Sequence, residues 1–392
     1  DPPPTEFTGV HHFWDLLEGV SKNNPDVIND DRDDVVILRF TGGTTGRGKC
    51  AMYCADNMLM CRDSFYAMPD PVWHSDVRML HLAPITHGSG MLYLPTLFKG
   101  GATVTMNFPD LDAWCNNIAA EKVNMVMMVP TLLYRLLELD TKDLKRLETL
   151  ETVCYGAAPM SPSKLKELQR ALGNIFIQLY GSTEHLGVAL ALSKPDHVLE
   201  GDDDHLASAG RPAPGVEVEL MDDDGQRVAT GEIGELWLRS RATGKGYFGD
   251  PEQTASEFKD GFWKSGDIGR MDERGFVYIV DRKKDMIITG GFNVYANEVE
   301  SALNSHPAVL MSAVVGIPHE EWGEAIHAEV TLKTGAEAEP VELIEHVREQ
   351  LGGYKSPKTV EVVEELPVSA VGKVLRRQVR EKYWSSEERK VG

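Results

Sequence analysis

Short apolar runs alternate with longer polar stretches over much of the chain. Residues 77–82, 102–106 and 123–129 have the length and the apolar content of buried strands. The segments between and after them are predicted to form helices at residues 58–66, 111–121 and 132–139. The alternation continues from residue 153 to residue 179, so we expect a parallel sheet with crossover helices. Ligands of such sheets bind at the carboxyl ends of the strands.

The pattern changes in the second half of the chain. From Gly210 onward short strands and turns replace the alternation, with strands expected at residues 216–221, 235–238 and 275–280. Beyond Asp281 a basic segment precedes a last region with its own strand and helix signals. We therefore expect an α/β fold in two domains, a large one at residues 1–281 and a small α+β domain at residues 282–392.

A glycine- and threonine-rich loop follows residues 35–38, an apolar run that predicts a buried strand. In such a loop, glycine lets backbone N–H groups converge on a phosphate, threonine hydroxyls add donors, and basic side chains supply charge. We expect the loop to bind a nucleotide polyphosphate. Its candidate ligands are Thr41, Gly42, Gly43, Thr44, Thr45, Gly46 and Lys49.

Two other interpretations of the loop stay open. Residues 43–49 match the spacing of a P-loop, but Cys50 stands where that motif needs Ser or Thr to hold Mg²⁺. A thiol is a poor ligand for a hard cation. A flexible glycine turn is less favoured, because three threonines and a lysine are concentrated in it.

The 392 residues carry a formal net charge of −21. This acidity argues against binding to nucleic acid or to an anionic membrane, so local cations and backbone N–H groups must hold any bound anion. Five cysteines without a Cys-x-x-Cys pair fit reduced thiols in a cytoplasmic protein better than disulfides or a zinc site. No apolar run reaches the length of a membrane span, and we expect no transmembrane segment.

Further stretches combine residues suited to nucleotide chemistry. Residues 156–158 are small and follow a strand, which suits a flat ring lying close to the backbone or simply a tight strand-to-helix turn. Residues 178–184 join an aromatic ring, hydroxyls and a carboxylate, a set that suits base stacking, phosphate contact and Mg²⁺. Asp267 stands in a turn, where it could accept two ribose hydroxyls. Taken alone, residues 281–285 and 369–377 would be interpreted as solvated charge.

The order and spacing of these stretches, from Val35 to Arg377, resemble the adenylate-forming superfamily. That superfamily includes acyl- and aryl-CoA synthetases, nonribosomal peptide synthetase adenylation domains and firefly luciferase. The resemblance implies layered αβ sheets and a β-rich part in the large domain, plus a small mobile C-terminal domain. It implies that ATP and Mg²⁺ activate a carboxylic acid to an acyl-adenylate and pyrophosphate, and that the acyl group then passes to a thiol such as that of CoA.

The resemblance also assigns roles to residues of the large domain. It implies that residues 41–49 form a mobile phosphate loop and that His87 lies at the mouth of the acyl pocket. It places Thr183 at the α-phosphate, Glu184 at Mg²⁺ and Asp267 at the ribose hydroxyls. Around the adenine and ribose it places Gly156, Ala157, Ala158, Gln178, Leu179, Tyr180, Gly181, Ile279 and Arg282.

Three residues of the predicted small domain receive roles in the same way. Lys284 falls at the hinge about which this domain rotates, Gly291 falls where the pantetheine arm passes, and Lys373 bridges the carboxylate and the α-phosphate. Attack of a carboxylate on a phosphate brings anions together, so a lysine and Mg²⁺ have to neutralise charge. A lysine with an ordinary pKa is already a cation at pH 7. The CoA thiol attacks an activated anhydride, so we expect no catalytic cysteine, and His87 is expected to gate or orient.

The chain departs from the family pattern at Gly42, Gly48 and Cys50, where Ser, Pro and Gly are usual. We expect the lost Ser hydroxyl to affect ATP affinity and not the type of reaction. A larger departure is that only a remnant of the usual N-terminal region precedes the loop. We therefore expect either a fragment or a partner that supplies the rest, as a second chain or within a homo-oligomer.

The acceptor and the acid are less constrained. CoA is the favoured acceptor, with an acyl-AMP ligase or adenylation domain that loads a carrier protein as the first alternative. A P-loop ATPase or kinase, which would release ADP, and a non-catalytic nucleotide-binding remnant are the others. Apolar residues near the expected pocket favour a fatty, alicyclic or aromatic acid over an amino acid, namely Met91, Leu92, Val129 and Leu186.

Overall fold

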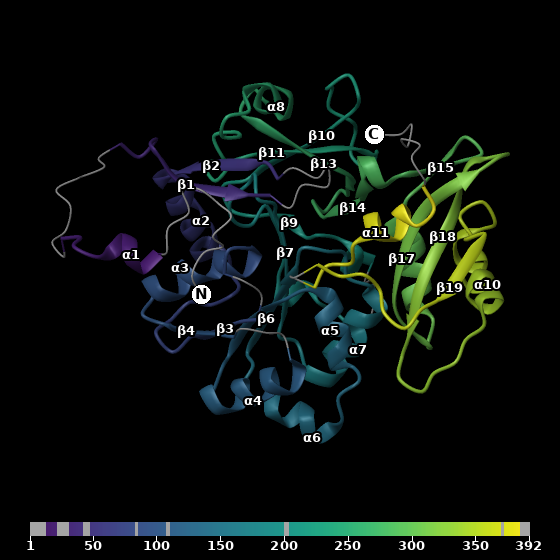
Figure 1. Ribbon diagram of the computed structural model, residues 1–392, viewed down its shortest axis with the longest axis horizontal. Coiled ribbons are helices and arrows are strands. Elements are labelled where there is room, and N and C mark those ends of the chain that lie inside the picture. The colour runs from purple at the N-terminus through teal and green to yellow at the C-terminus, as the bar shows by residue number, and fades with distance from the viewer. Residues whose placement is uncertain are drawn as a thin grey trace.

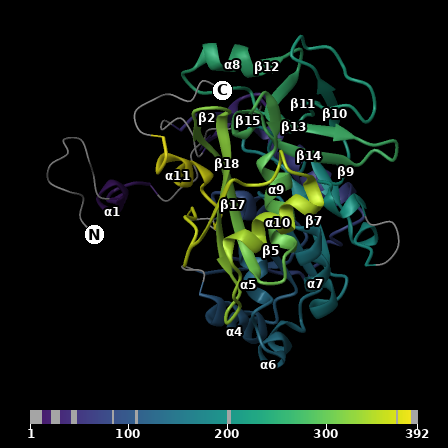
Figure 2. The same cartoon turned by 90° about the vertical axis from the view of Figure 1, so that its right-hand side faces the viewer.

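The computed structural model describes residues 13–21, 31–41, 48–82, 85–106, 110–199, 204–369 and 372–384. Within these ranges the strands form four sheets (Figure 1). The C-terminal sheet and its helices lie beside the rest of the chain, on the right in Figure 1 and toward the viewer in Figure 2. The mixed α/β architecture predicted from the sequence is confirmed.

The largest sheet has seven strands; the first five pair in parallel, and the last two pairings, of β7 with β8 and of β8 with β9, are antiparallel. Their spatial order is β4 (Ala102–Thr105), β3 (Arg78–His81), β5 (Met125–Met128), β6 (Thr152–Gly156), β7 (Phe176–Tyr180), β8 (Leu190–Leu192) and β9 (Arg211–Pro212). The predicted parallel sheet is therefore confirmed. Neighbouring strands end at one edge, which is where the predicted nucleotide residues lie.

Successive side chains of this sheet's strands point to opposite sides of the sheet, and a hydrophobic core packs against each side. Both faces of the sheet are therefore buried. Leu80, Val126 and Val153 face a core formed with Trp114, Leu133 and Leu165. These come from helices α4 (Leu111–Glu121), α5 (Pro130–Leu136) and α7 (Pro162–Leu172). Met79, Met125 and Cys154 face a second core with Phe65 and Leu92, which includes helix α2 (Ala55–Ala67). Helices α3 (Tyr93–Phe98) and α6 (Thr141–Leu144) complete the helical layers.

Local sequence signals set the helix ends. Asp110 accepts a hydrogen bond from the N–H of Ala113 at 2.7 Å and so caps the start of α4. Helix α7 has Pro162 in its first turn, where the missing N–H costs nothing, and ends at Gly173 with φ of +84°.

A five-stranded sheet packs at the antiparallel end of the large one. It consists of β10 (Glu217–Met221), β11 (Gly234–Arg239), β13 (Phe262–Met271) and β12 (Phe258–Lys259), with β14 (Val277–Arg282) paired to β13. Its Leu236 and Val277 share a core with Leu190 of β8. This packing brings β13 to the end of β7. Helix α8 (Pro251–Glu257) leads into β12.

The chain beyond Lys283 forms a third sheet with its own core. The strands are β16 (Phe292–Val294), β15 (Ile287–Thr289), β18 (Gly323–Leu332) and β17 (Val309–His319), with β19 (Thr359–Val362) parallel to β18. Helices α9 (Ala296–Ser305) and α10 (Pro340–Leu351) contribute Val299 and Leu343 to that core. Helix α11 (Arg376–Glu381) packs through Val379 against β17. A separate core from residue 287 onward supports the predicted boundary at residues 281–282, which stays a prediction.

The strand before the phosphate loop differs from its prediction. Among the described residues, strand β1 (Val35–Phe40) pairs only with β2 (Cys50–Cys54), in a two-stranded antiparallel sheet. Val35, Val36, Leu38 and Phe40 are exposed, so the prediction of a buried strand was wrong. In a two-stranded sheet each strand has a neighbour on one side only. No other described element packs over these four side chains. Helix α1 (Phe13–Leu17) precedes it.

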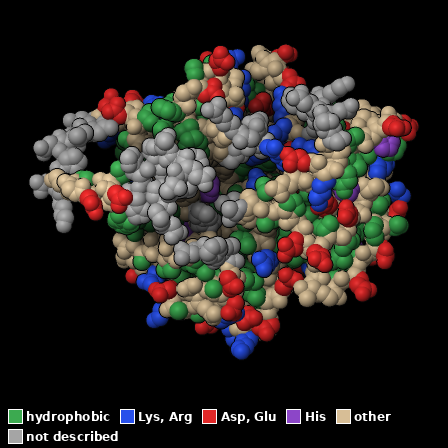
Figure 3. All heavy atoms as spheres, viewed as in Figure 1, with side chains coloured by type: hydrophobic (Ala, Val, Ile, Leu, Met, Phe, Trp, Pro, Cys, Tyr) green, Lys and Arg blue, Asp and Glu red, His purple; other side chains and the backbone are tan. Residues whose placement is uncertain are grey.

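The surface agrees with the composition. Acidic and basic side chains are interspersed on the face shown in Figure 3, and the chain as a whole is acidic. None of the described helices is both long enough and apolar enough to cross a membrane. All five cysteines are buried and free of disulfides.

Gly156 offers a test of the packing at the sheet edge. A Cβ at this position would lie 2.0 Å from the carbonyl oxygen of Leu179 in β7. We expect Gly156→Ala to lower the free energy of unfolding by about 1–3 kcal/mol, because backbone has to move to admit the methyl group. Denaturant unfolding measures the loss. Gly353→Ala is the control, since nothing lies within 4 Å of its added Cβ; equal stability of both variants would contradict the close approach.

Candidate active site

The predicted adenine-binding segments meet at the carboxyl ends of β6 and β7. Gly156 is the last residue of β6, and Ala157 follows with a left-handed φ of +66°. Gly181 approaches the backbone of Gly187 so closely that an added Cβ would lie 2.4 Å from its carbonyl oxygen. The close approach of backbone carbonyl oxygens thus explains why both positions need glycine. Residues 156–158 do form the tight strand-to-helix turn that the sequence left open, beside residues 178–181.

Tyr180, Asp267 and Arg282 form a hydrogen-bonded group next to this turn. The hydroxyl of Tyr180 donates to Asp267 Oδ2 at 2.5 Å, and Arg282 Nε lies 3.3 Å from Asp267 Oδ1. Asp267 in β13 and Arg282 in β14 are direct cross-strand partners. Burial and the neighbouring carboxylate raise the pKa of Tyr180 well above its usual value. The structure therefore brings together three residues that lie far apart in the sequence.

The base of the phosphate loop is closed by Thr41 and Lys49. The N–H of Thr41 donates to the carbonyl of Lys49 at 2.8 Å, and the N–H of Lys49 donates to Thr41 Oγ1 at 3.3 Å. Five predicted ligands lie outside the described residues: Gly42, Gly43, Thr44, Thr45 and Gly46.

A polar chain connects Lys49 to the predicted metal ligand Glu184. Lys49 Nζ and the hydroxyl of Tyr247 both bond to the carboxylate of Glu257. The same hydroxyl donates to Glu184 Oε1 at 2.9 Å. Lys49 Nζ also lies 5.0 Å from the centre of the Tyr247 ring. The loop lysine is thus anchored near Glu184 by residues of the segment that leads to β12.

Sequence reasoning missed Tyr247 and Glu257. Tyr247 stands in a stretch with three glycines, Gly244, Gly246 and Gly249, which was a signal that could have been used, and both residues follow Glu184 by more than sixty positions. Their involvement comes from α8, which carries Glu257 to the end of β7. Glu184 is half-buried there, and a carboxylate suits Mg²⁺, a hard cation that prefers oxygen ligands. Thr183 is its half-buried neighbour in the same segment.

The turn that carries Lys373 packs against the start of helix α5. Gly372 has φ of +80°, and the hydroxyl of Thr131 donates to its carbonyl oxygen at 2.5 Å. A Cβ on Gly372 would lie 3.1 Å from Cγ2 of Val129. Since Val129 and Thr131 follow β5, this contact fixes Lys373 at the carboxyl edge of the large sheet.

Lys373 shares the electrostatic environment of the Tyr180 group. Burial and the positive charge of Arg282 lower its pKa from the ordinary value to about 8, although Asp267 acts in the opposite direction. The sequence argument assumed an ordinary pKa, and that assumption was wrong. The ammonium group is nevertheless predominantly protonated at pH 7, as its predicted role requires.

An ionic network around Arg376 anchors the segment that carries Lys373. Arg376 bonds to Glu300 Oε1 at 2.7 Å and Oε2 at 2.5 Å and to Asp281 Oδ1 at 3.2 Å. Asp281 is fully buried, and its other oxygen accepts from the N–H of Ala296 at 2.6 Å, at the start of α9. Arg380 adds a 3.0 Å bond to Asp285. These charges are structural, so the interpretation of residues 281–285 and 369–377 as solvated charge was wrong.

The remaining predicted residues lie around this centre or apart from it. Lys284 is half-buried in a short 3₁₀ turn, Lys283–Asp285, directly after β14, and Ile279 lies half-buried within β14. Gly291 lies in the turn between β15 and β16, within the C-terminal sheet. His87 is exposed before a 3₁₀ turn, Gly88–Leu92. Near this turn, Leu92, Met127 and Leu186 belong to one buried core. Met91 is partly buried and packs against that core.

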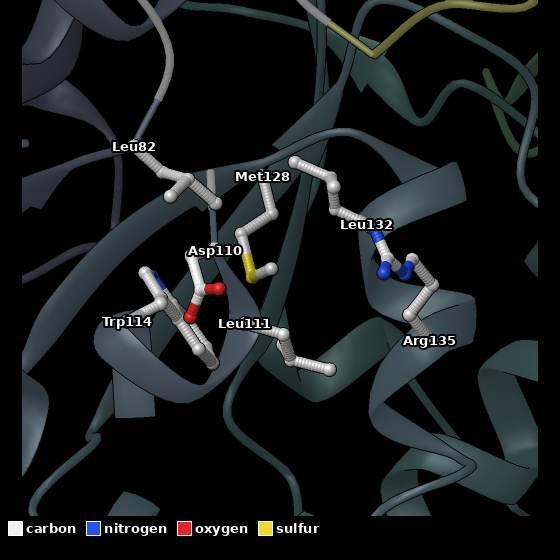
Figure 4. Close-up of a pocket in the computed structure, with 7 residues that line it drawn as sticks. All are labelled: Leu82, Asp110, Leu111, Trp114, Met128, Leu132 and Arg135. Atoms are coloured by element: carbon white, nitrogen blue, oxygen red, sulfur yellow. The ribbon is translucent and has the colours of Figure 1, made fainter. Parts of the chain in front are cut away.

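A small pocket opens between α4 and α5, next to the Gly372 contact (Figure 4). It is lined by Leu82, Asp110, Leu111, Trp114, Met128, Leu132 and Arg135. None of the predicted site residues lines it. We therefore do not assign it to the acyl group.

Comparison with known sequences decides the family. Residues 4–248 match the family described as AMP-binding enzyme, and residues 298–373 match its C-terminal domain. The chain belongs to the AMP-binding enzyme family. The P-loop ATPase or kinase interpretation is accordingly not supported.

Curated relatives of this AMP-binding enzyme include acid–CoA ligases. It is 38% identical to the medium/long-chain-fatty-acid–CoA ligase FadD8 of Mycobacterium tuberculosis, over 92% of this chain and 63% of that protein. It is 37% identical to a feruloyl-CoA synthase of Amycolatopsis, over 90% of this chain and 70% of the relative. The chain therefore spans less than two thirds of the length of the first of these relatives.

Among solved structures, MatB from Rhodopseudomonas palustris is similar in two states. ATP-bound MatB superposes with a TM-score of 0.82 at 31% identity, over 94% of this chain and 72% of that one. Apo MatB, with the same coverage and 32% identity, gives 0.70. The arrangement of this AMP-binding enzyme is thus closer to the ATP-bound form.

The lowered pKa of Lys373 predicts a pH-dependent stability. Between the folded value of about 8 and the unfolded value of about 10.4, the unfolded chain binds more protons. Below pH 8 the buried, charged lysine therefore lowers the free energy of unfolding. This loss becomes smaller as the pH rises from about 8 toward about 10.4. We expect Lys373→Met to raise the Tm of the nucleotide-free protein at pH 7 and to lose this advantage by pH 10. Lys358→Met, at an exposed lysine, is the control; a pH-independent difference would contradict the assignment.

Proposed function

We propose that this protein uses ATP to activate a carboxylic acid as an acyl-adenylate and then transfers the acyl group to CoA. The single observation that supports it most is the docking of the Lys373 turn on the end of β5. This docking puts a cation beside Asp267 and Arg282, and Glu184 follows strand β7 at the carboxyl edge of the same sheet. The relatives named as CoA ligases favour CoA over a carrier protein as the acceptor.

In the proposed first step, a carboxylate oxygen of the acid attacks the α-phosphorus of ATP, and the bond to pyrophosphate breaks. Both reactants are anions, so positive charge at the point of attack lowers the barrier. Lys373 supplies this charge between the carboxylate and the α-phosphate. Lys49 and the backbone of residues 41–49 bind the pyrophosphate that leaves. To do so, Lys49 has to give up its ion pair with Glu257 and pair with a phosphate instead.

Other residues position the nucleotide. Asp267 accepts the ribose hydroxyls, while the ring of Tyr180 and residues 156–158 border the adenine. Ile279 and Arg282 complete that side. Glu184 would hold Mg²⁺ with Thr183 at the α-phosphate, and the bound ion would supply further charge neutralisation.

In the proposed second step, the CoA thiolate attacks the acyl carbonyl and AMP leaves. The arm of CoA passes Gly291, which lies in a turn of the C-terminal sheet. Since Lys373 is docked at the edge of the large sheet here, residues 282–392 have to rotate about Lys284 between the steps. Arg376 contacts Asp281 before this hinge and Glu300 after it, so the rotation has to rearrange the contact to Asp281.

The acid we propose is fatty or aromatic. Met91, Leu92 and Leu186 belong to the apolar core next to the His87 turn, and apolar walls suit a fatty or aromatic acid better than an amino acid. We place the reaction in the cytoplasm, where ATP and CoA are available. A homo-oligomer or a second chain stays a prediction.

The two steps can be separated with Lys373→Ala. We expect the full-length variant to lose at least about 100-fold in pyrophosphate release across a panel of fatty and aromatic acids, because charge neutralisation at the α-phosphate is lost. Thioester formation from preformed acyl-AMP and CoA should stay near the wild-type rate. Lys358→Ala is the control, because it removes an exposed lysine that also lies in the C-terminal part of the chain. Release of ADP instead of AMP, or equal loss of both steps, would count against the proposal.

Glu184→Gln tests the proposed metal ligand. We expect the Mg²⁺ concentration for half-maximal adenylate formation to rise at least about tenfold, because an amide carries no charge to hold the ion. Magnesium titrations of pyrophosphate release measure the shift. Glu252→Gln, at an exposed glutamate of α8, should titrate as the wild type does. An unchanged titration of Glu184→Gln would remove this residue from the metal site.

A further inference from the structure

Three potential metal ligands meet on one face of the C-terminal sheet, in a cluster that the proposed reaction does not use. His327 and Glu329 lie on β18, and Glu361 lies on the parallel strand β19. One ligand atom from each lies within 4.8 Å of the others. Glu329 and Glu361 are direct cross-strand partners, an arrangement of like charges that destabilises a sheet unless a cation compensates it.

The carboxylate of Glu329 is the unusual member of this cluster. The residue is fully buried, with 0% of its surface exposed. Its Oε1 accepts from Lys382, but Oε2 is buried without a hydrogen-bond partner. A buried carboxylate oxygen without a donor is costly. A metal ion would satisfy it, since a cation can bind the oxygen directly.

His327 is held in a form suited to metal binding. Its Nδ1 lies 2.7 Å from the hydroxyl of Thr359, and its Nε2 lies 2.9 Å from the hydroxyl of Tyr383. In the tautomer whose Nδ1–H donates to Thr359, the Nε2 lone pair accepts from the Tyr383 hydroxyl, and a metal ion can take the place of that hydroxyl. An outer hydrogen bond such as that of Nδ1 orients metal-binding histidines.

The cluster is closed by two residues that follow α11. Lys382 pairs with Glu329, and the hydroxyl of Tyr383 also lies 3.3 Å from Glu361 Oε2. One ammonium group opposes two carboxylates, which leaves a net negative charge. The Lys382 side chain is 51% exposed, so it can swing into solvent without opening the sheet.

We propose that His327, Glu329 and Glu361 bind a divalent transition-metal ion such as Zn²⁺, in exchange for the ammonium group of Lys382 on Glu329 and the hydroxyl of Tyr383 on His327. One imidazole and two carboxylates match the ligands of Zn²⁺, whereas an imidazole is a poor ligand for Mg²⁺. Ligand atoms around a tetrahedral Zn²⁺ lie about 3.4 Å apart, so small side-chain rotations close the site. The site lies on the C-terminal sheet and is separate from Glu184.

Calorimetric titration of the metal-stripped, full-length protein with Zn²⁺ alone tests this site. We expect one ion per chain, with the affinity reduced at least about 100-fold in His327→Asn and in Glu329→Gln. Glu345→Gln and His319→Asn, which alter the same region outside the cluster, should bind as the wild type does. Binding that survives both cluster variants would overturn the proposal.

Lys382→Met keeps the test decisive if a cluster variant fails to fold. This change removes the competing ammonium group and leaves the three ligands intact, so we expect Zn²⁺ to bind about tenfold more tightly. The Zn²⁺-induced rise in Tm should grow in parallel. An affinity that is unchanged or weaker in Lys382→Met, or no Zn²⁺ binding by the wild type, would overturn the proposal.

Discussion

The arrangement of the candidate site depends on the buried ion pairs of Arg376. This guanidinium contacts Glu300 and Asp281, and it lies three positions after Lys373. Removing one partner of a buried ion pair leaves an uncompensated charge, which costs several kcal/mol, about 3–5. The network therefore restricts where the Lys373 segment can lie. Because Asp281 also binds the N-terminus of α9, the same charges connect β14, α9 and the Lys373 segment.

An acidic protein that binds a polyanion has to concentrate its few cations. Here two cations of the candidate site already face a carboxylate: Lys49 faces Glu257, and Arg282 faces Asp267. Tyrosine hydroxyls bind the same carboxylates, through Tyr247 in one group and Tyr180 in the other. The charges of Lys49 and Arg282 are thus balanced before a nucleotide arrives, and for these two residues binding becomes an exchange of partners. This explains how a chain with a net charge of −21 keeps a cluster of basic residues in place.

The cluster on the C-terminal sheet addresses an opposite electrostatic problem. There two carboxylates lie side by side on parallel strands, and Lys382 is the cation that faces Glu329. At the candidate active site tertiary packing supplies cations to hold an anion. On the C-terminal sheet it gathers anions and a histidine in a place where a cation is needed. The two clusters belong to different sheets and use no residue in common.

The sequence by itself determined the strand and helix order of the large sheet and the segments that end at its edge. It did so because buried strands and crossover helices have distinct apolar periods, and because motif residues are local in sequence. It was misleading for residues 35–38, since an apolar run cannot distinguish a buried strand from one exposed in a two-stranded sheet. Tertiary structure alone decided that Tyr247 and Glu257 join Glu184 and Lys49. It alone decided that Asp281 is buried beside Arg376, and that the pKa of Lys373 falls to about 8. Hydrogen bonds and desolvation depend on which distant segments pack together, and no local pattern records that.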